Sequence, residues 1–269
     1  MSTPILQAER ITVQYEGKTA VRGVSLALYG GEFTALIGLN GCGKTSLLRA
    51  ICGLTPHTAE GTRSVEGRDC GGMGARQLAR EISYLPQRHS IVYDTPVLDV
   101  VMMGFNPYLG LFESPGKPHR EQALAMLGKL GYEAFAGKDF LRLSEGEKQM
   151  VLLCRALVQA TPVMLLDEPD SALDFVNRHR MLKAIRQQVR AGTASSLITL
   201  HDPNYALKYC DRILLMHEGE LIDEVEVEAA GITRVKDALA RIYGSIDVVD
   251  YEGTYYMVKK EKQLRIRET

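Results

Sequence analysis

The stretch Phe33-Thr-Ala-Leu-Ile-Gly-Leu-Asn-Gly-Cys-Gly-Lys-Thr45 decides the fold of this chain. Its first five residues form a nearly continuous apolar run, as in a strand that is buried on both faces of a sheet. Residues 38–45 then fit the pattern G-x-x-x-x-G-K-[ST], and residues 45–52 have helical spacing. A strand, a glycine-rich turn and a helix in this order are the context that a phosphate-binding loop needs.

The loop has the chemistry for binding a nucleotide. Its glycines let backbone N–H groups converge on phosphate oxygens, and the following helix N-terminus adds partial positive charge. We expect Lys44 to reach the β- and γ-phosphates and the Thr45 hydroxyl to ligate Mg²⁺. A helix N-terminus can lower a thiol pKa, which would activate Cys42; a residue without a special role is an equal alternative. The predicted nucleotide-binding residues of the loop are Gly38, Leu39, Asn40, Gly41, Cys42, Gly43, Lys44, Thr45 and Ser46.

Two carboxylates follow a second apolar run. Residues 163–166 are Val-Met-Leu-Leu, and Asp167 and Glu168 come directly after them. A buried parallel strand delivers such residues to the carboxyl edge of its sheet, where ligands of such folds bind. We expect Asp167 to hold Mg²⁺, directly or through water, and Glu168 to accept a proton from the attacking water as a general base. An acidic pair after a strand is common and does not by itself indicate catalysis. Its occurrence together with a phosphate loop favours a catalytic role.

The remaining pattern indicates an α/β fold. Short apolar strands are expected at 82–85, 197–200 and 213–216, and helical stretches separate several of them, which favours a parallel sheet with crossover helices. Residues 11–15 and 24–28 alternate like strands before the phosphate loop. Further helices are predicted at 119–130, 145–159 and 232–243, followed by a hairpin at 246–258.

Composition excludes several classes of protein. A chain of 269 residues suits one large α/β domain, with or without a small appendage, and 32 basic against 33 acidic side chains create no field that would attract nucleic acid. No apolar run approaches the roughly 18–20 residues of a membrane-spanning helix, and the N-terminus lacks the layout of a signal peptide. The five cysteines form no C-x-x-C pair, which argues against a zinc site or a disulfide framework. We therefore expect a cytosolic protein, with any membrane-spanning part supplied by other chains.

A further motif narrows the interpretation. Leu143-Ser-Glu-Gly-Glu-Lys-Gln149 resembles the LSGGQ signature of ABC (ATP-binding cassette) ATPases, and it precedes Leu166-Asp-Glu-Pro169 at a spacing typical of that family. The other motifs appear in family order: the adenine-stacking aromatic at Tyr15, the Q-loop at Gln87, the D-loop at Asp174 and the switch histidine at His201. These ordered motifs cover most of residues 15–220.

The resemblance implies a fold and a domain organisation. The fold is a P-loop NTPase core with a mostly parallel sheet, an N-terminal antiparallel β subdomain and an inserted helical subdomain. Residues 1–240 would form the ATPase domain, residues 88–160 the helical insertion within it, and residues 241–269 a C-terminal extension.

The resemblance also implies site residues and an assembly. Glu168, His201 and Gln87 would act in ATP hydrolysis, and Thr45, Gln87 and Asp167 would hold Mg²⁺. Two copies would form a head-to-tail homodimer with two ATP molecules at the interface. The phosphate loop of one subunit would then face Ser144, Gly146 and Glu147 of the other.

The signature of this chain departs from the family pattern. Glu145 replaces a glycine and Glu147 a glutamine. Ser144-x-x-Glu147 is also a capping box, and a capped helix N-terminus still donates N–H groups to an anion. Two acids near a phosphate should oppose closure of the dimer unless they point away from it or Lys148 neutralises them.

The class of transporter follows from a weaker resemblance. Residues 98–112 are similar to the Gly-Arg-x-Pro-His stretch of metal-chelate importers, with Phe105 in place of the arginine and Tyr108 in place of the histidine. This implies an ATP-hydrolysing, energy-coupling subunit of an importer for iron-siderophore, haem or cobalamin-type chelates. It would lie on the cytoplasmic face of the inner membrane, with two transmembrane permease subunits and, indirectly, a substrate-binding protein as partners.

Two alternatives remain open at this point. One is a soluble ABC ATPase that acts on ribosomes or chromosomes, although such proteins usually carry two cassettes or a long coiled-coil insertion. The other is a nucleotide-gated regulatory subunit with negligible turnover. The sequence does not identify the cargo, because the cargo is not expected to touch this subunit.

Overall fold

The phosphate loop follows an inner strand of a six-stranded sheet. The computed structural model describes residues 3–55, 58–87, 91, 93–110, 112–192 and 194–260. The strand order is β10-β9-β3-β8-β7-β6, in which β10 is antiparallel to β9 and the other neighbours are parallel. The strands are β3 (Phe33–Ile37), β6 (Ile82–Leu85), β7 (Val163–Leu166), β8 (Ser195–Thr199), β9 (Arg212–His217) and β10 (Glu220–Glu226).

A smaller antiparallel sheet, formed by strands from the N-terminal part of the chain, packs on this core. Its strands are β1 (Pro4–Tyr15), β2 (Lys18–Tyr29), β4 (Thr58–Val65) and β5 (Arg68–Asp69), in the order β2-β1-β4-β5. Its apolar face packs against helix α1 (Lys44–Ile51) and one face of the large sheet, in a cluster that includes Leu6, Val24, Leu36 and Leu47. This packing fixes the helix that begins at the phosphate loop.

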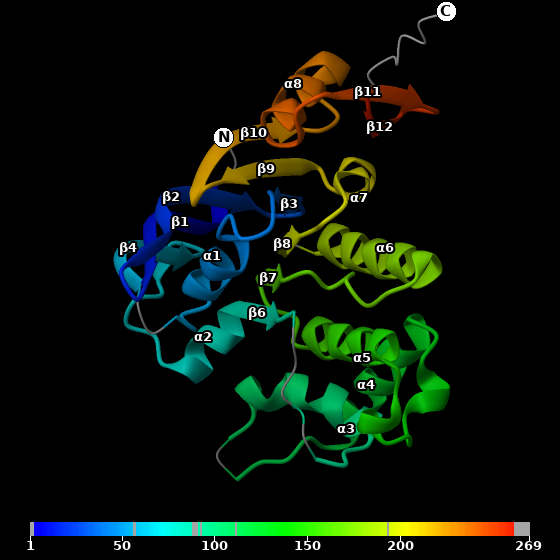
Figure 1. Ribbon diagram of the computed structural model, residues 1–269. Coiled ribbons are helices and arrows are strands. Elements are labelled where there is room, and N and C mark those ends of the chain that lie inside the picture. Colours follow the sequence, from blue (N-terminus) through cyan, green and yellow to red (C-terminus); the bar gives the residue numbers. More distant parts are fainter. Residues whose placement is uncertain are drawn as a thin grey trace, which may run out of the picture.

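Helices cover the rest of the molecule. They are α2 (Ala75–Glu81), α3 (Val97–Met102), α4 (Lys117–Lys129), α5 (Glu145–Val158), α6 (Phe175–Ala191), α7 (Pro203–Tyr209) and α8 (Gly231–Tyr243), with the 3₁₀ segments η1 (Met103–Tyr108), η2 (Glu133–Phe135) and η3 (Phe140–Arg142). Helices α3, α4 and α5 gather at one end of the molecule, and α8 lies at the other with the hairpin of β11 (Ile246–Tyr251) and β12 (Thr254–Lys259) (Figure 1). No helix among the described residues is both long and apolar enough to cross a membrane.

The predicted fold class is confirmed. Strands at 82–85 and 163–166 and helices at 145–158 and 231–243 lie where the periodicity placed them, within a residue or two. The strands β1 and β2 are longer than predicted. Register shifts interrupt the alternation of apolar and polar residues along them, so the sequence pattern shows only part of each strand.

Candidate functional site

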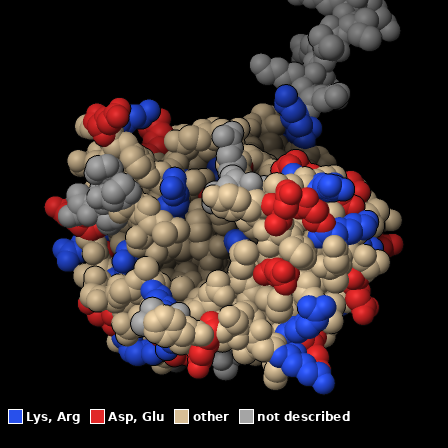
Figure 2. Space-filling view, turned by 90° about the horizontal axis from the view of Figure 1, so that it is seen from below, with Lys and Arg blue, Asp and Glu red and all other residues tan. Residues whose placement is uncertain are grey.

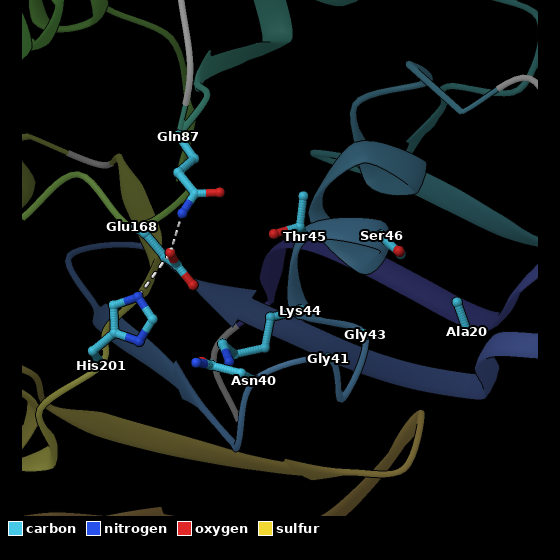
Figure 3. Close-up of a pocket in the computed structure, with 10 residues that line it drawn as sticks. All are labelled: Ala20, Asn40, Gly41, Gly43, Lys44, Thr45, Ser46, Gln87, Glu168 and His201. Carbon is cyan, nitrogen blue, oxygen red and sulfur yellow. Dashed lines mark hydrogen bonds and ion pairs between the residues drawn. The ribbon is translucent and has the colours of Figure 1, made fainter. Parts of the chain in front are cut away.

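A pocket of about 480 Å³ opens at the carboxyl edge of the large sheet. The phosphate loop follows β3, Gln87 follows β6, Glu168 follows β7 and His201 follows β8. Parallel strands end at the same edge of a sheet, so these distant segments meet there. The residues that line the pocket are Ala20, Asn40, Gly41, Gly43, Lys44, Thr45, Ser46, Gln87, Glu168 and His201 (Figure 3).

The conformation of the loop requires glycine at positions 38 and 43. Gly43 has φ +108°, and a Cβ atom there would lie 2.3 Å from the carbonyl oxygen of Ala20. A Cβ atom on Gly38 would lie 2.3 Å from the carbonyl oxygen of Met216. The Lys44 ammonium donates to the carbonyl oxygens of Gly38, at 2.8 Å, and Leu39, at 3.2 Å. The loop therefore wraps around its own lysine at the N-terminus of α1.

Four predicted nucleotide-binding residues lie outside the lining of this pocket: Tyr15, Gly38, Leu39 and Cys42. Leu39 is about half exposed at the tip of the loop. Tyr15 ends β1, pairs with Lys18 in β2 and packs against the core of the small sheet. Cys42 is buried, with its Sγ atom in the space that a Cβ atom on Gly38 would need.

The environment of Cys42 does not activate its thiol. Burial raises the pKa of the Cys42 thiol, and the nearby Lys44 ammonium opposes this only in part. Of the two alternatives left open for Cys42, a lowered thiol pKa is not supported, because removal from water outweighs the charge of the loop. The alternative of a packed residue without a special role is favoured.

The carboxylate of Asp167 is fully buried and held by three hydroxyl groups. Its Oδ1 accepts hydrogen bonds from Thr45 Oγ1, at 3.1 Å, and Thr199 Oγ1, at 3.0 Å. Its Oδ2 accepts from the Tyr84 hydroxyl at 3.3 Å. Burial raises the pKa of the Asp167 carboxyl, and the hydrogen bonds from Thr45 and Thr199 oppose that increase. The structure thus brings together Thr45 and Asp167, two of the three residues predicted to hold Mg²⁺.

Glu168 contacts two other lining residues of the pocket. Its Oε2 accepts a hydrogen bond from the Gln87 side-chain amide, and the Nε2 of His201 lies 2.8 Å from the same oxygen. Gln87 and His201 approach this carboxylate from opposite sides (Figure 3). Glu168 is therefore in direct contact with both of the other residues predicted to act in hydrolysis, although the three lie far apart in the sequence.

The signature residues lie at the start of α5, outside the lining of this pocket. Ser144 is the N-cap, and the capping box predicted from the sequence is present. The Glu147 carboxylate accepts hydrogen bonds from the backbone N–H of Ser144, at 2.8 Å, and from its hydroxyl, at 2.7 Å. The Lys148 ammonium lies 2.7 Å from the carboxylate of Glu145. Glu147 is thus folded back onto the cap, and Lys148 offsets the charge of Glu145.

The D-loop segment is also ordered by capping. Asp174 caps α6 by accepting a hydrogen bond from the backbone N–H of Asn177 at 2.8 Å. Arg178, one turn into the helix, pairs with the buried carboxylate of Asp170 at 3.3 Å and donates to the backbone carbonyl oxygens of Asp170 and Leu173. This arginine fixes the turn that carries Asp174.

Sequence reasoning missed several residues of the site. Ala20 contributes through its backbone position in β2, and no pattern in the sequence indicates it. Thr199 and Tyr84 contact Asp167, and each is a polar residue near the carboxyl end of a buried parallel strand. A polar residue at the carboxyl end of a predicted buried strand was the signal that could have identified Thr199 and Tyr84.

Comparison with known proteins places the chain in a family. A family model described as ABC transporter matches residues 21–171. The hemin import ATP-binding protein HmuV of Pseudomonas aeruginosa is 39% identical over 222 residues, which cover 80% of this chain and 84% of that protein. The cobalamin import ATP-binding protein BtuD of Halobacterium salinarum is 34% identical over 219 residues, which cover 81% of this chain and 54% of that protein.

Solved structures show the same fold. A nucleotide-free ATP-binding cassette from an ABC transporter superposes with a TM-score of 0.77 at 23% sequence identity, covering 90% of this chain and 98% of that one. The matched family model spans the phosphate loop, the signature and the two carboxylates at the centre of the site. The resemblance drawn from the motifs is thus confirmed, and this chain belongs to the ABC transporter family.

Proposed function

We propose that this chain is the ATP-hydrolysing, energy-coupling subunit of an importer for metal chelates of the iron-siderophore, haem or cobalamin type. The observation that carries the ATPase part is the meeting of Lys44, Thr45, Gln87, Glu168 and His201 around one pocket. The hemin and cobalamin import relatives support the importer part.

The phosphate loop is the part of the site that would hold ATP. Its backbone N–H groups and the N-terminus of α1 attract the phosphates, and the Lys44 ammonium would exchange its two carbonyl partners for phosphate oxygens. Tyr15 would stack on the adenine from the end of β1.

The residues beside the loop fit Mg²⁺. The Thr45 hydroxyl, the Asp167 carboxylate and the Gln87 amide all offer oxygen, and the first two already lie 3.1 Å apart. Oxygen is the ligand that Mg²⁺ prefers. When bound, the ion would neutralise charge on the phosphate oxygens.

Hydrolysis then needs one proton transfer and one displacement at the γ-phosphorus. Glu168 would take a proton from water while the water oxygen bonds to the γ-phosphorus and the bond from that phosphorus to the bridging oxygen breaks, which leaves ADP and phosphate. His201 would hold the carboxylate of Glu168 in position through the contact at 2.8 Å.

A second copy of the chain would complete the pocket. In the proposed head-to-tail dimer, the N-terminus of α5 with Ser144 and Gly146 would face the γ-phosphate on the partner. A Cβ atom at position 146 would lie 2.9 Å from the carbonyl oxygen of Ala172, so glycine keeps this helix start close to the D-loop turn. Closure of the dimer would then depend on ATP.

A surface groove supports the proposed contact with a membrane partner. The groove has a volume of about 480 Å³ and lies between α2 and η1, where Leu54 and Met103 are partly exposed apolar residues of its lining. Arg76 and Arg80 donate to the carbonyl oxygen of Pro107 and fix one wall. We propose that this groove receives part of a permease subunit on the cytoplasmic face of the membrane.

The two residues that depart from the metal-chelate motif, Phe105 and Tyr108, both make contacts within the protein. Phe105, at the position of the arginine, is buried and packs on the ring of His119 at 4.7 Å between centroids. Tyr108, at the position of the histidine, donates to the carbonyl oxygen of Gln159 at 2.8 Å. Both side chains therefore stabilise η1 against its neighbours.

The distribution of charge does not favour the alternative of action on ribosomes or chromosomes. On the face seen in Figure 2, acidic and basic side chains are interspersed and form no continuous basic stripe. A nucleic-acid partner normally requires such a stripe. The regulatory alternative depends on turnover, which the following experiment measures.

The central test is Glu168→Gln. We expect this variant to bind ATP with an affinity within a few-fold of wild type, and to lose hydrolysis by at least about a hundredfold, because an amide cannot accept the proton. With Mg²⁺ and ATP it should accumulate a closed dimer in size-exclusion chromatography and small-angle X-ray scattering. Glu121→Gln, an exposed acid on α4, is the matched control.

The outcomes separate the parts of the proposal. Near-normal hydrolysis by Glu168→Gln would remove the assignment of the general base. Lone protomers at saturating Mg²⁺ and ATP would remove the shared site. Negligible turnover of the wild type, with or without a co-purified membrane partner, would favour the regulatory alternative.

A further inference from the structure

The hydroxyl group of Thr199 contacts both acidic residues of the site. Thr199 is the last residue of β8 and is fully buried. Its Oγ1 donates to Oδ1 of Asp167 at 3.0 Å and accepts a hydrogen bond from the backbone N–H of Glu168 at 2.7 Å. A hydroxyl has one donor and two acceptor positions, so it can make both bonds at once. One side-chain atom therefore links the carboxylate of Asp167 to the backbone of Glu168.

The backbone of Glu168 needs such a link. Its φ is +47°, in the left-handed region that side chains other than glycine rarely adopt. A residue stays in this region only when its surroundings hold it there. The hydrogen bond from its N–H to Thr199 is a direct restraint on this conformation, from which the side chain reaches Gln87 and His201 (Figure 3).

Other buried hydroxyls on the same strand behave differently. The Oγ atoms of Ser195 and Ser196 are buried and have no hydrogen-bond partner among the described residues. The strand therefore tolerates hydroxyls that do nothing for the site, and Ser196 offers a matched control for the removal of one.

A second hydroxyl contacts Asp167 but not Glu168. The Tyr84 hydroxyl, on β6, donates to Oδ2 of Asp167 at 3.3 Å, from the side of β7 opposite to β8. Tyr84 and Thr199 thus restrain the two oxygens of the same carboxylate, and of these two hydroxyl groups only that of Thr199 also bonds the backbone N–H of Glu168.

We propose that Thr199 is a positioning residue for ATP hydrolysis, which orients the Asp167 carboxylate and fixes the backbone of Glu168 through one hydroxyl group. This inference rests on the roles proposed above for Asp167 and Glu168. Thr199 does not touch the reacting atoms; it acts through the two residues that do.

The test compares Thr199→Val, which keeps the shape and removes the hydroxyl, with Thr199→Ser, which keeps the hydroxyl. Outer-shell partners of metal-binding and catalytic groups are typically worth about 10- to 100-fold in metal affinity or activity. We therefore expect kcat of Thr199→Val to fall by about 10- to 100-fold, with the Kd for ATP in the absence of Mg²⁺ within about threefold of wild type. Thr199→Ser should stay within about threefold in kcat, and Ser196→Ala should match wild type.

Hydrogen exchange supplies a readout that does not depend on turnover. In the nucleotide-free protein, the Glu168 amide should exchange at least about tenfold faster in Thr199→Val than in wild type, since its acceptor is gone. Tyr84→Phe should raise the Mg²⁺ concentration needed for half-maximal hydrolysis and leave the exchange of the Glu168 amide unchanged. That difference between the two variants is specific to a hydroxyl that bridges both acids.

Three results would overturn the proposal. These are wild-type kcat in Thr199→Val, wild-type exchange of the Glu168 amide in that variant, and a Thr199→Ser variant as slow as Thr199→Val. If Thr199→Val does not fold, Thr199→Ala gives the same comparison without a second buried methyl group. If Glu168→Gln retains hydrolysis, the general-base assignment fails, and the amide exchange still tests the link from Thr199 to Glu168.

Discussion

At the residue scale, Glu147 combines a structural and a functional effect. Its carboxylate accepts two hydrogen bonds from Ser144, and these bonds lower the pKa of the Glu147 carboxyl, the hydroxyl contributing most. The cap is therefore complete above the ordinary pKa of a glutamate, about 4.3, and is lost only as the pH falls through the lower value of the folded state. At neutral pH Glu147 keeps a full negative charge beside the helix start that is proposed to face a phosphate.

Glu147→Gln should therefore strengthen ATP-driven dimerisation. The amide still accepts hydrogen bonds from Ser144, but it removes a negative charge from the N-terminus of α5. Repulsion between two unit charges about 4–10 Å apart in water is worth about 0.4–1 kcal/mol, so we expect the dimer to form at an ATP concentration about two- to fivefold lower. Analytical ultracentrifugation of Glu168→Gln with and without the second change measures this.

The matched control is Glu145→Gln. Lys148 already offsets the charge of Glu145, so the second variant should have a smaller effect. The difference from wild type should be constant between pH 6 and 8, because Glu147 is ionised throughout this range, and it should shrink with added salt. Equal or weaker dimerisation in Glu147→Gln would contradict the idea that this charge opposes closure.

At the element scale, Arg212 connects the two sheets. It begins β9, is almost fully buried, and pairs with Glu32 in the turn before β3 and with Glu224 in β10. It also donates to the backbone carbonyl oxygen of Ala27 in β2. One guanidinium group thus joins β2 of the small sheet to β9, β10 and the turn before β3 in the large one.

Arg212→Met should strongly destabilise the fold. The methionine keeps the apolar stem but leaves the Glu32 carboxylate in a half-buried position without its partner, and such losses typically cost about 3–5 kcal/mol. Arg234→Met is the control, because the Arg234 guanidinium is 43% exposed and Asp223 would keep Arg241 as a partner, so this change should cost about 1 kcal/mol or less. Urea unfolding measures both, and equal effects of the two changes would show that the buried pair has no special weight.

A polar side chain of α7 helps to hold the C-terminal hairpin to the core. Asn204, in α7, accepts a hydrogen bond from the backbone N–H of Met257 at 2.7 Å and donates to its carbonyl oxygen at 3.4 Å. Ile246 and Val248 bury their side chains on the same core. Because α7 begins two residues after His201, the hairpin supports the segment that follows the switch histidine.

At the scale of the whole molecule, the helices α3, α4 and α5 and the groove beside η1 lie at one end, away from the hairpin (Figure 1). The proposed importer needs a surface that transmits closure of the dimer to other chains. The groove is bordered by α2, η1 and the end of α5, so we expect it to move when the two halves of the proposed site close. The position of the groove therefore supports the proposal that a permease subunit binds at the end of the molecule formed by α3, α4 and α5.

A pull-down of the full-length chain in mild detergent should therefore retain a polytopic membrane protein. We expect Leu54→Asp, a change in the partly exposed wall of the groove, to reduce its recovery by at least about tenfold, because burying an unpaired carboxylate is costly. The Kd for ATP should not change. Repeated recovery of ribosomes in place of a permease would favour the soluble alternative.

The sequence by itself determined the chemistry of the site. The phosphate loop, the acids at 167 and 168 and the signature at 143–149 each consist of residues that are close together in the sequence. Their spacing along the chain is therefore enough to recognise them. A strand followed by glycines and a helix can be recognised locally, and so can a capping box. These features were enough to predict the fold class and the central residues of the pocket.

Only the tertiary structure decided how those residues are held. Thr199 and Tyr84 lie 32 and 83 residues from Asp167 in the chain, and they reach it because β6, β7 and β8 are adjacent parallel strands. The burial that raises the pKa of Cys42 likewise depends on packing around the loop rather than on its neighbours in sequence. A hydrogen bond between distant segments forms only after the sheet has brought them together, so no local pattern records it.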